Sequence, residues 1–71
     1  MKTQQIKIEQ IRNAIHIGRM AKMEDKLRFP YHDTNLMEIV KTHRADLPGN
    51  ASFIELFDAW LKGWDLQNLE E

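Results

Sequence analysis

The sequence of 71 residues predicts an all-α fold, a small three-helix domain that spans residues 1–71. Apolar residues recur at three- and four-residue steps in three segments, which is the spacing of one face of a helix. Two breaks separate these segments, at residues 29–33 around Pro30 and at residues 47–50 around Pro48 and Gly49, because proline disfavours helix in the residue before it and Pro-Gly favours a turn. The expected order is a helix, a Pro-Tyr loop, a second helix, a Pro-Gly turn and an aromatic helix.

The composition is that of a folded chain, with 42% hydrophobic and 30% charged residues. The absence of cysteine excludes a disulfide framework and a thiolate zinc site. No apolar run approaches the roughly 18 residues of a membrane span, and the N-terminus lacks a signal-peptide pattern, so we expect a cytoplasmic protein without membrane contact. The core of so small a chain supplies about 3–5 kcal/mol at most, which favours a homodimer or a larger partner.

The first helix is expected over residues 3–25 and is apolar on two sides. One side carries Ile8, Ile11 and Ile15, and the other carries Ile6, Ile17 and Met20. A helix that is apolar on two sides usually packs against more than one neighbour. We therefore predict that the second of these sides is the face for a second copy of the chain or for another protein partner.

Two features leave the conformation of this first segment open. Lys22 falls on the side of Ile11 and Ile15 in an ideal helix, so the apolar stripe must rotate, or the helix must bend or end, near residues 18–22. Ile6 and Ile8 alternate and are β-branched, which is typical of strands, so a short strand over residues 4–9 is the alternative.

The second helix is expected over residues 34–45 and is too short to be stable alone. Asn35 and Glu38 fit a capping box at its start, and Asp33 or Thr34 are the alternative caps. His43, near the end of this helix, is expected to satisfy free carbonyl groups of the last turn.

The third helix carries the predicted core. Ser52 and Glu55 form a capping box directly after the Pro-Gly turn. The apolar stripe that follows is about 140° wide on an ideal helix, and its members are Phe53, Leu56, Phe57, Trp60, Leu61 and Trp64. Gly63 lies inside this helix, where glycine costs about 1 kcal/mol relative to alanine, so we expect another backbone to pass close to it.

The charges are distributed unevenly along the chain. Residues 1–28 carry seven Lys or Arg and three Asp or Glu, a net +4, whereas residues 29–71 carry three and eight, a net −5. One interpretation is that the two halves attract each other, within one fold or across a head-to-tail dimer. The other is that the basic half contacts nucleic acid or an acidic partner through a strip on the first helix. That strip consists of Arg12, Arg19, Lys22, Lys26 and Arg28.

No constellation of residues predicts catalysis, a metal site or a cofactor site. The three histidines are 16 and 11 residues apart, whereas a helical zinc pair needs histidines three or four residues apart. The three glycines are isolated, so no phosphate-binding loop is present, and Ser52 is already explained as a helix cap. We therefore expect a protein that is not an enzyme and has no catalytic residues, metal, cofactor or small-molecule substrate.

Three short pieces of the sequence resemble the ribosome modulation factor family and its phage-encoded relatives. They are AIHIGRMA at residues 14–21, Phe29-Pro30-Tyr31, which is similar to the family's Cys-Pro-Tyr, and AWLKGW at residues 59–64, which is similar to its Trp-Leu-x-Gly-Trp. The resemblance implies two helices joined by a Pro-Tyr loop, and binding to the small ribosomal subunit, which the best-known members silence. Here the gap between Pro-Tyr and the first Trp is longer and holds a whole helix, and the chain is slightly acidic, whereas the ribosome binders are strongly basic.

These observations favour a small non-enzymatic regulatory or inhibitory protein that acts by binding a macromolecular partner. The resemblance to phage-encoded proteins suggests a phage or mobile-element origin. A protein partner or a homodimer is expected first. The alternative function is nucleic-acid or ribosome binding through the basic strip. Salt distinguishes the two, because a phosphate contact weakens steeply with salt and an apolar contact does not.

Overall fold

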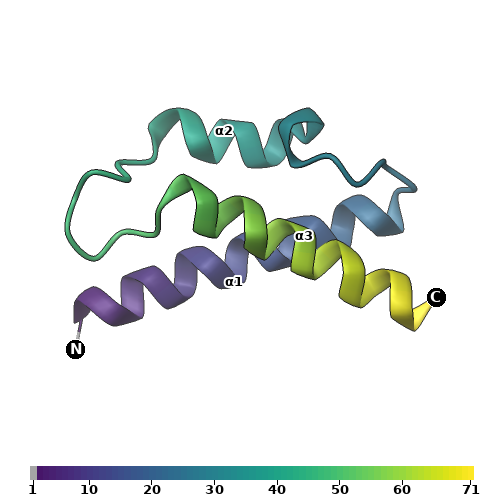
Figure 1. The fold of residues 1–71 in the computed structure, drawn as a ribbon, viewed down its shortest axis with the longest axis horizontal. Coiled ribbons are helices and arrows are strands. Elements are labelled where there is room, and N and C mark those ends of the chain that lie inside the picture. The colour runs from purple at the N-terminus through teal and green to yellow at the C-terminus, as the bar shows by residue number, and fades with distance from the viewer. Residues whose placement is uncertain (1) are drawn as a thin grey trace.

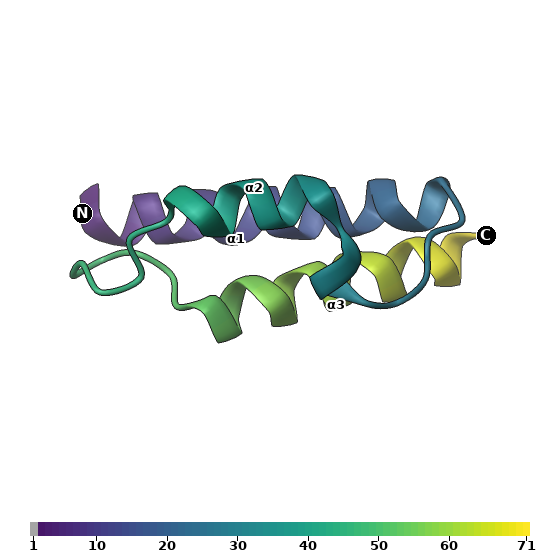
Figure 2. The same cartoon turned by 90° about the horizontal axis from the view of Figure 1, so that it is seen from above.

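The structure, a computed structural model, describes the backbone of residues 2–71 and the side chains from Ile6 onward. It contains three α-helices, α1 (Lys2–Met23), α2 (Thr34–Thr42) and α3 (Phe53–Glu70), one short 3-10 helix, η1 (Pro30–His32), and no strand in the described range. The predicted all-α fold is confirmed, and the strand considered for residues 4–9 is part of α1. Figure 1 shows that α1 and α3 run in the same direction and cross, while α2 runs in the opposite direction. Figure 2 shows the three helices from above.

The helix α1 ends at Met23 in a Schellman motif. The amide of Lys26 donates to the carbonyl of Ala21 at 3.0 Å, the amide of Asp25 donates to that of Lys22 at 2.9 Å, and Asp25 has a left-handed φ of 59°. The helix passes through Lys22 without ending there. The Lys22 side chain is only 15% exposed, and its ammonium group lies 5.6 Å from the centroid of the Trp64 ring. The aliphatic stem therefore occupies the apolar side while the charge lies over an aromatic face.

Side-chain caps set the starts of α2 and α3. Asp33 caps α2, because its Oδ1 accepts from the amides of Asn35 at 2.9 Å and Leu36 at 3.2 Å. The cap is thus the predicted alternative, and the predicted box of Asn35 with Glu38 is wrong. The predicted capping box of α3 is confirmed, since Ser52 Oγ accepts from the Glu55 amide at 3.1 Å and Glu55 accepts from the Ser52 amide at 3.0 Å.

The loop between α2 and α3 is joined to both neighbouring helices. α2 ends at Thr42, earlier than the predicted residue 45. As predicted, His43 satisfies a carbonyl group at the end of α2, since its backbone amide donates to the carbonyl of Val40 at 3.3 Å. Its ring Nε2 instead donates to the carbonyl of Ala51. Gln10 of α1 reaches the same loop, since its Oε1 accepts from the Ala51 amide at 2.7 Å and its Nε2 donates to Asn50 Oδ1 at 3.2 Å. These bonds fix where α3 begins relative to α1.

The helices α1 and α3 cross in direct backbone contact because two glycines lie at the crossing. A Cβ on Gly18 would overlap the carbonyl group of Trp60, and a Cβ on Gly63 would overlap that of Ile15. Small residues continue this contact along both helices, and the buried ones are Ala14, Ala21 and Ala59. The predicted approach of a backbone to Gly63 is confirmed, and that backbone belongs to α1.

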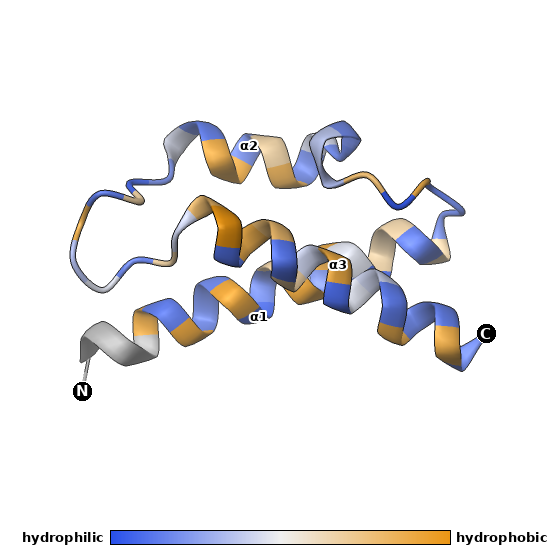
Figure 3. Ribbon diagram, in the orientation of Figure 1, coloured by the Kyte–Doolittle hydropathy of each residue, from blue (hydrophilic) through white to orange (hydrophobic). Residues whose placement is uncertain are grey.

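The core combines these small residues with three large side chains that are fully buried, Trp60, Leu36 and Leu56. Of the predicted core residues, Leu56 and Trp60 are buried, and the partly buried ones that pack against the core are Phe57, Leu61 and Trp64. Phe53 is 42% exposed, so its place in the predicted core is wrong. It stands in the first turn of α3, away from the crossing, with its ring 6.0 Å from that of His43. Figure 3 shows apolar and polar residues alternating around the helices.

Replacing Gly63 with alanine should destabilise the protein, although glycine-to-alanine changes in exposed helices stabilise by about 1 kcal/mol. The new methyl group would overlap the Ile15 carbonyl, and overpacking of this kind costs roughly 1–3 kcal/mol. We expect lower midpoints of thermal and urea unfolding, measured by circular dichroism. Asn68→Ala, at an exposed position of the same helix, is the matched control and should change the stability by less than about 0.5 kcal/mol. A Gly63→Ala variant as stable as the parent would contradict the close crossing.

Candidate functional site

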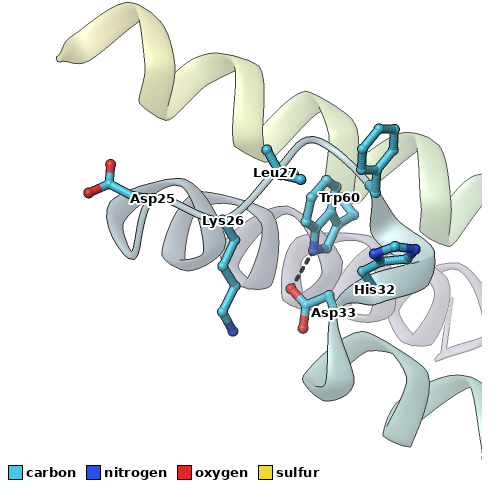
Figure 4. A pocket seen from close by; sticks show the side chains of 7 residues that line it. Asp25, Lys26, Leu27, His32, Asp33 and Trp60 are labelled. Carbon is cyan, nitrogen blue, oxygen red and sulfur yellow. Dashed lines mark hydrogen bonds between the residues drawn. The ribbon is translucent and has the colours of Figure 1, made fainter.

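Residues 24–33 join α1 to α2, and we call this segment the strap. Two tryptophans of α3 hold it in place. Trp64 Nε1 donates to the carbonyl oxygen of Lys26 at 3.0 Å, and Trp60 Nε1 donates to Asp33 Oδ2 at 2.7 Å. Figure 4 shows the second bond, with the indole of Trp60 directed at the carboxylate. Because the two tryptophans lie one turn apart on α3, that helix anchors the strap near its beginning and at its end.

Asp33 connects the strap to two helices at once. Its carboxylate is buried and accepts three N–H bonds, from the amides of Asn35 and Leu36 at Oδ1 and from the Trp60 indole at Oδ2. A buried carboxylate needs such partners, since an unpaired buried polar group costs free energy. The same side chain therefore caps α2 and holds Trp60 in the core.

The outer surface of the strap is apolar and exposed to solvent. Leu27 is 69% exposed, Phe29 is 52% exposed and Tyr31 is 68% exposed. The Tyr31 ring lies 4.9 Å from that of Phe57 on α3, and the Phe29 ring lies 5.6 Å from that of His32. These contacts orient the rings without burying them. Large apolar side chains are thus presented to solvent on a segment whose backbone is anchored.

Two shallow hollows flank the strap. One, of about 340 Å³, lies over Trp60 and is lined by Asp25, Lys26, Leu27, Phe29, His32 and Asp33 as well (Figure 4). The other, of about 460 Å³, lies over Trp64. Leu27 and Phe29 border both hollows. The strap therefore forms an apolar ridge between two depressions with tryptophan among their lining residues.

The structure places most of the predicted basic strip against acidic side chains of α3. Arg19 pairs with Glu70 at 2.6 Å and Lys22 pairs with Glu71 at 3.0 Å. Arg28 forms a two-bonded pair with Asp65, each bond 2.8 Å long. The interpretation that the two charged halves attract each other within one fold is confirmed for these three pairs. Acidic residues at the C-terminal end of α3 interact unfavourably with the negative end of the helix dipole, and the paired cations offset this effect.

The two remaining cations of the strip are less engaged. Lys26 lies 3.5 Å from Glu24 within the strap. Arg12 is exposed and forms no ion pair with any side chain that the structure describes. A phosphate contact through the whole strip would therefore have to displace the carboxylates of Asp65, Glu70 and Glu71, whereas Arg12 is open to solvent.

The ion pairs shift the ionisation of their acidic members. The guanidinium of Arg28 hydrogen-bonds the carboxylate of Asp65, which lowers the pKa of Asp65 and raises the pKa of Arg28. The ammonium of Lys22 lowers the pKa of Glu71 in the same way. The pKa of Glu55 is lowered chiefly by the backbone N–H of Ser52 in the capping box, with Lys7 adding to the effect. The carboxylates of these pairs are exposed, so salt screens the pairs.

The predicted partner face of α1 is divided in the structure. Ile6 and Met20 are exposed, whereas Ile17 is partly buried and packs against the core. The three residues therefore do not form one continuous open surface. The opposite apolar side, with Ile11 and Ile15, borders a groove between α1 and α3.

The described part of the chain shows neither a metal cluster nor a membrane span. Residues 2–71 hold no group of three or more His, Asp or Glu side chains close enough to bind a metal ion. Within the same range, no helix combines the length and the apolar character that crossing a bilayer requires.

Two kinds of site residue escaped the sequence analysis. The sequence indicates Asp33 only as a helix cap, because its bond to Trp60 spans 27 residues and no local pattern indicates such a bond. Leu27 and Phe29 lie in a segment without helical periodicity, so nothing in their spacing indicated exposure. The sequence signal for these residues is Leu27-Arg28-Phe29 directly before Pro30, where two large apolar residues flank an arginine.

Comparison of the chain with models of protein families, with curated proteins and with solved structures finds no match.

Replacing Asp33 with alanine should lower the stability by roughly 2–4 kcal/mol, because the helix cap is lost and the buried indole N–H of Trp60 is left without a partner. Urea unfolding followed by tryptophan fluorescence measures this change. Asp46→Ala is the control, because Asp46 is exposed and its ion pair is with Arg44 in the same loop. An Asp33→Ala variant that unfolds at the urea concentration of the parent would contradict the anchoring role of this carboxylate.

The stability should fall on acidification. The ordinary pKa values are 3.8 for Asp65 and 4.5 for Glu71, and folding lowers both. A carboxyl with a lowered folded pKa stabilises fully above its ordinary value, and the contribution disappears as the pH falls through the folded pKa. The urea midpoint should therefore decrease below about pH 4.5. The double variant Asp65→Asn, Glu71→Gln should show a smaller decrease, and an equal decrease would contradict the role of these pairs.

Proposed function

We propose that this chain is a small non-enzymatic regulatory or inhibitory protein that binds another protein through the outer surface of the strap. The observation that carries the proposal is the exposure of Leu27, Phe29 and Tyr31 on a segment anchored by Trp60 and Trp64. Action in the cytoplasm and a phage or mobile-element origin are parts of the same proposal.

An anchored apolar ridge is well suited to binding a protein. The strap loses little conformational freedom when a partner docks, because the Lys26 carbonyl and the Asp33 side chain already hold it to α3. Aromatic side chains are enriched among the residues that dominate interface energies. Complete burial of Leu27 and Phe29 under a partner would contribute roughly 1.5–3 kcal/mol each. The two hollows beside the ridge offer apolar surface for side chains of the partner.

The pieces that resemble the ribosome modulation factor family come together around the strap. Gly18 of the first piece packs against Trp60 and Trp64 of the third. Tyr31 of the second piece packs on Phe57, one turn before Trp60. Their convergence supports a shared arrangement of helix, Pro-Tyr loop and tryptophan helix. Binding to the small ribosomal subunit belongs to the alternative function.

The alternative function is nucleic-acid or ribosome binding through Arg12, Arg19, Lys22, Lys26 and Arg28. One observation favours it, since Lys26 and Arg28 alternate with the exposed Leu27 and Phe29. Cations beside exposed aromatic rings suit single-stranded nucleic acid, which stacks its bases on such rings. The ion pairs of Arg19, Lys22 and Arg28 with α3 disfavour it.

The double variant Leu27→Ser, Phe29→Ser tests the proposed function. Both side chains are exposed, so circular dichroism and the melting curve should match the parent to within about 0.5 kcal/mol. Used as bait in a nuclease-treated cell lysate, the parent should capture a protein, identified by mass spectrometry, and the variant should bind it about tenfold more weakly or worse.

Two further variants make this experiment specific. Ile54→Ser removes a side chain that is 72% exposed at the other end of α3, and it should capture the partner as the parent does. A variant with Arg12, Arg19, Lys22 and Lys26 all changed to Gln should also keep the partner. Capture that the parent shows only in an untreated lysate, and that this variant lacks, would instead support the nucleic-acid function. Equal capture by the strap variant and the parent would contradict the proposed function.

A further inference from the structure

A second surface, separate from the strap, lies between α1 and α3. A groove of about 240 Å³ is lined by Ile11 and Ile15 of α1 and by Glu55, Asp58, Ala59 and Lys62 of α3. Neither α2 nor the strap contributes to this lining, so α1 and α3 form the groove without them. The groove extends the apolar side of α1 that carries Ile8, whose side chain is 48% exposed. On α3, the exposed Leu66 follows Ala59 by seven residues, about two helical turns, and therefore lies on the same face.

The charged residues beside this groove differ from those at the ends of the two helices. Lys7, Arg19 and Lys22 of α1 are all paired with acidic residues of α3 or of its C-cap. Spacing of four and three residues places Arg12 on the side of α1 that carries Ile8 and Ile15, and Asp58 lines the groove on the α3 side. Neither forms an ion pair with any side chain described by the structure. The α1 side thus carries an unpaired cation, and the α3 side carries the unpaired anion Asp58, with the unpaired Lys62 one helical turn further along α3.

The register of the two helices places these charges at similar heights. Lys7 pairs with Glu55, and Ile15 lies against Gly63. The parallel helices are offset by 48 positions at these contacts and by 42 to 46 positions where Gly18 lies against Trp60 and Trp64. Arg12 is therefore level with residues 54–60 of α3, a stretch that contains Asp58.

We propose that this face is the contact between two copies of the chain. A two-fold axis that runs along the helices in the plane of the face would lay α1 of each copy over α3 of the other. Arg12 of each copy would then meet Asp58 of the other copy, and the isoleucines of each α1 would cover the groove beside Ala59. An isologous contact requires a surface that complements itself, and opposite charges on the two edges of one apolar groove fulfil this requirement. The proposal is independent of the strap and of the proposed function.

Charge reversal tests the proposal in the full-length chain. The parent should shift from 8.4 kDa toward twice that mass as its concentration rises, measured by analytical ultracentrifugation. Arg12→Asp alone and Asp58→Arg alone each place like charges across the contact, so each should weaken dimerisation on the order of tenfold or more. The double variant Arg12→Asp, Asp58→Arg should dimerise like the parent, and an equimolar mixture of the two single variants should form the mixed dimer.

The control is Lys41→Asp, a charge reversal on the exposed surface of α2, which should leave the dimer unchanged. Circular dichroism of each variant should match the parent, since the altered residues are exposed. A parent that stays at 8.4 kDa up to about 1 mM would overturn the proposal. Dimerisation that neither single variant weakens would also overturn it, and would place the contact on another face such as that of Ile6 and Met20.

Discussion

The absence of side chains at Gly18 and Gly63 is the constraint on which the rest of the structure depends. It allows the backbones of α1 and α3 to touch, which brings Trp60 and Trp64 against the last turns of α1. The indole N–H groups of both tryptophans then reach the strap that leaves α1. A wider crossing would separate the tryptophans from the strap, and the strap would lose its anchors. The exposed ridge of Leu27 and Phe29 is therefore a consequence of packing at a distant point.

The same crossing determines how the charges of the two halves meet. Because α1 and α3 are parallel and in contact, the acidic end of α3 arrives beside the basic end of α1 (Figure 1). Carboxylates near the end of α3 pair with the cations that a free basic helix would offer to phosphate. The basic first half and the acidic second half of the chain thus partly neutralise each other within the fold. Binding through apolar surface fits this neutralised arrangement better than binding through charge.

Sequence patterns predict the elements of this fold better than its contacts. Periodicity and the Ser52 capping box indicate the helices, because both signals are local. The close approach of another backbone to Gly63 could also be predicted, because glycine is unfavourable inside a helix and its presence there indicates close packing. The role of Asp33 could not be predicted, because its partner Trp60 is 27 residues away. Phe53 fits the apolar stripe of α3 yet remains exposed, because the first turn of the helix lies away from the crossing.

The candidate site shows the same division between local and long-range information. The basic strip is visible in the sequence, but its pairing with residues more than 35 positions away is a property of the fold. The strap is visible only as a break around Pro30. Its exposed apolar surface depends on which of its residues α3 anchors and which it leaves in solvent, and that follows from tertiary structure alone.

Nuclear Overhauser effects at the two glycines test this account most directly. If α1 and α3 touch at the crossing, the Hα protons of Gly18 will show strong effects to backbone protons of Trp60 and Trp64, and those of Gly63 to Ile15. The indole N–H protons of both tryptophans will also exchange slowly with solvent. A folded, helical protein without effects between these glycines and the opposite helix would contradict the account.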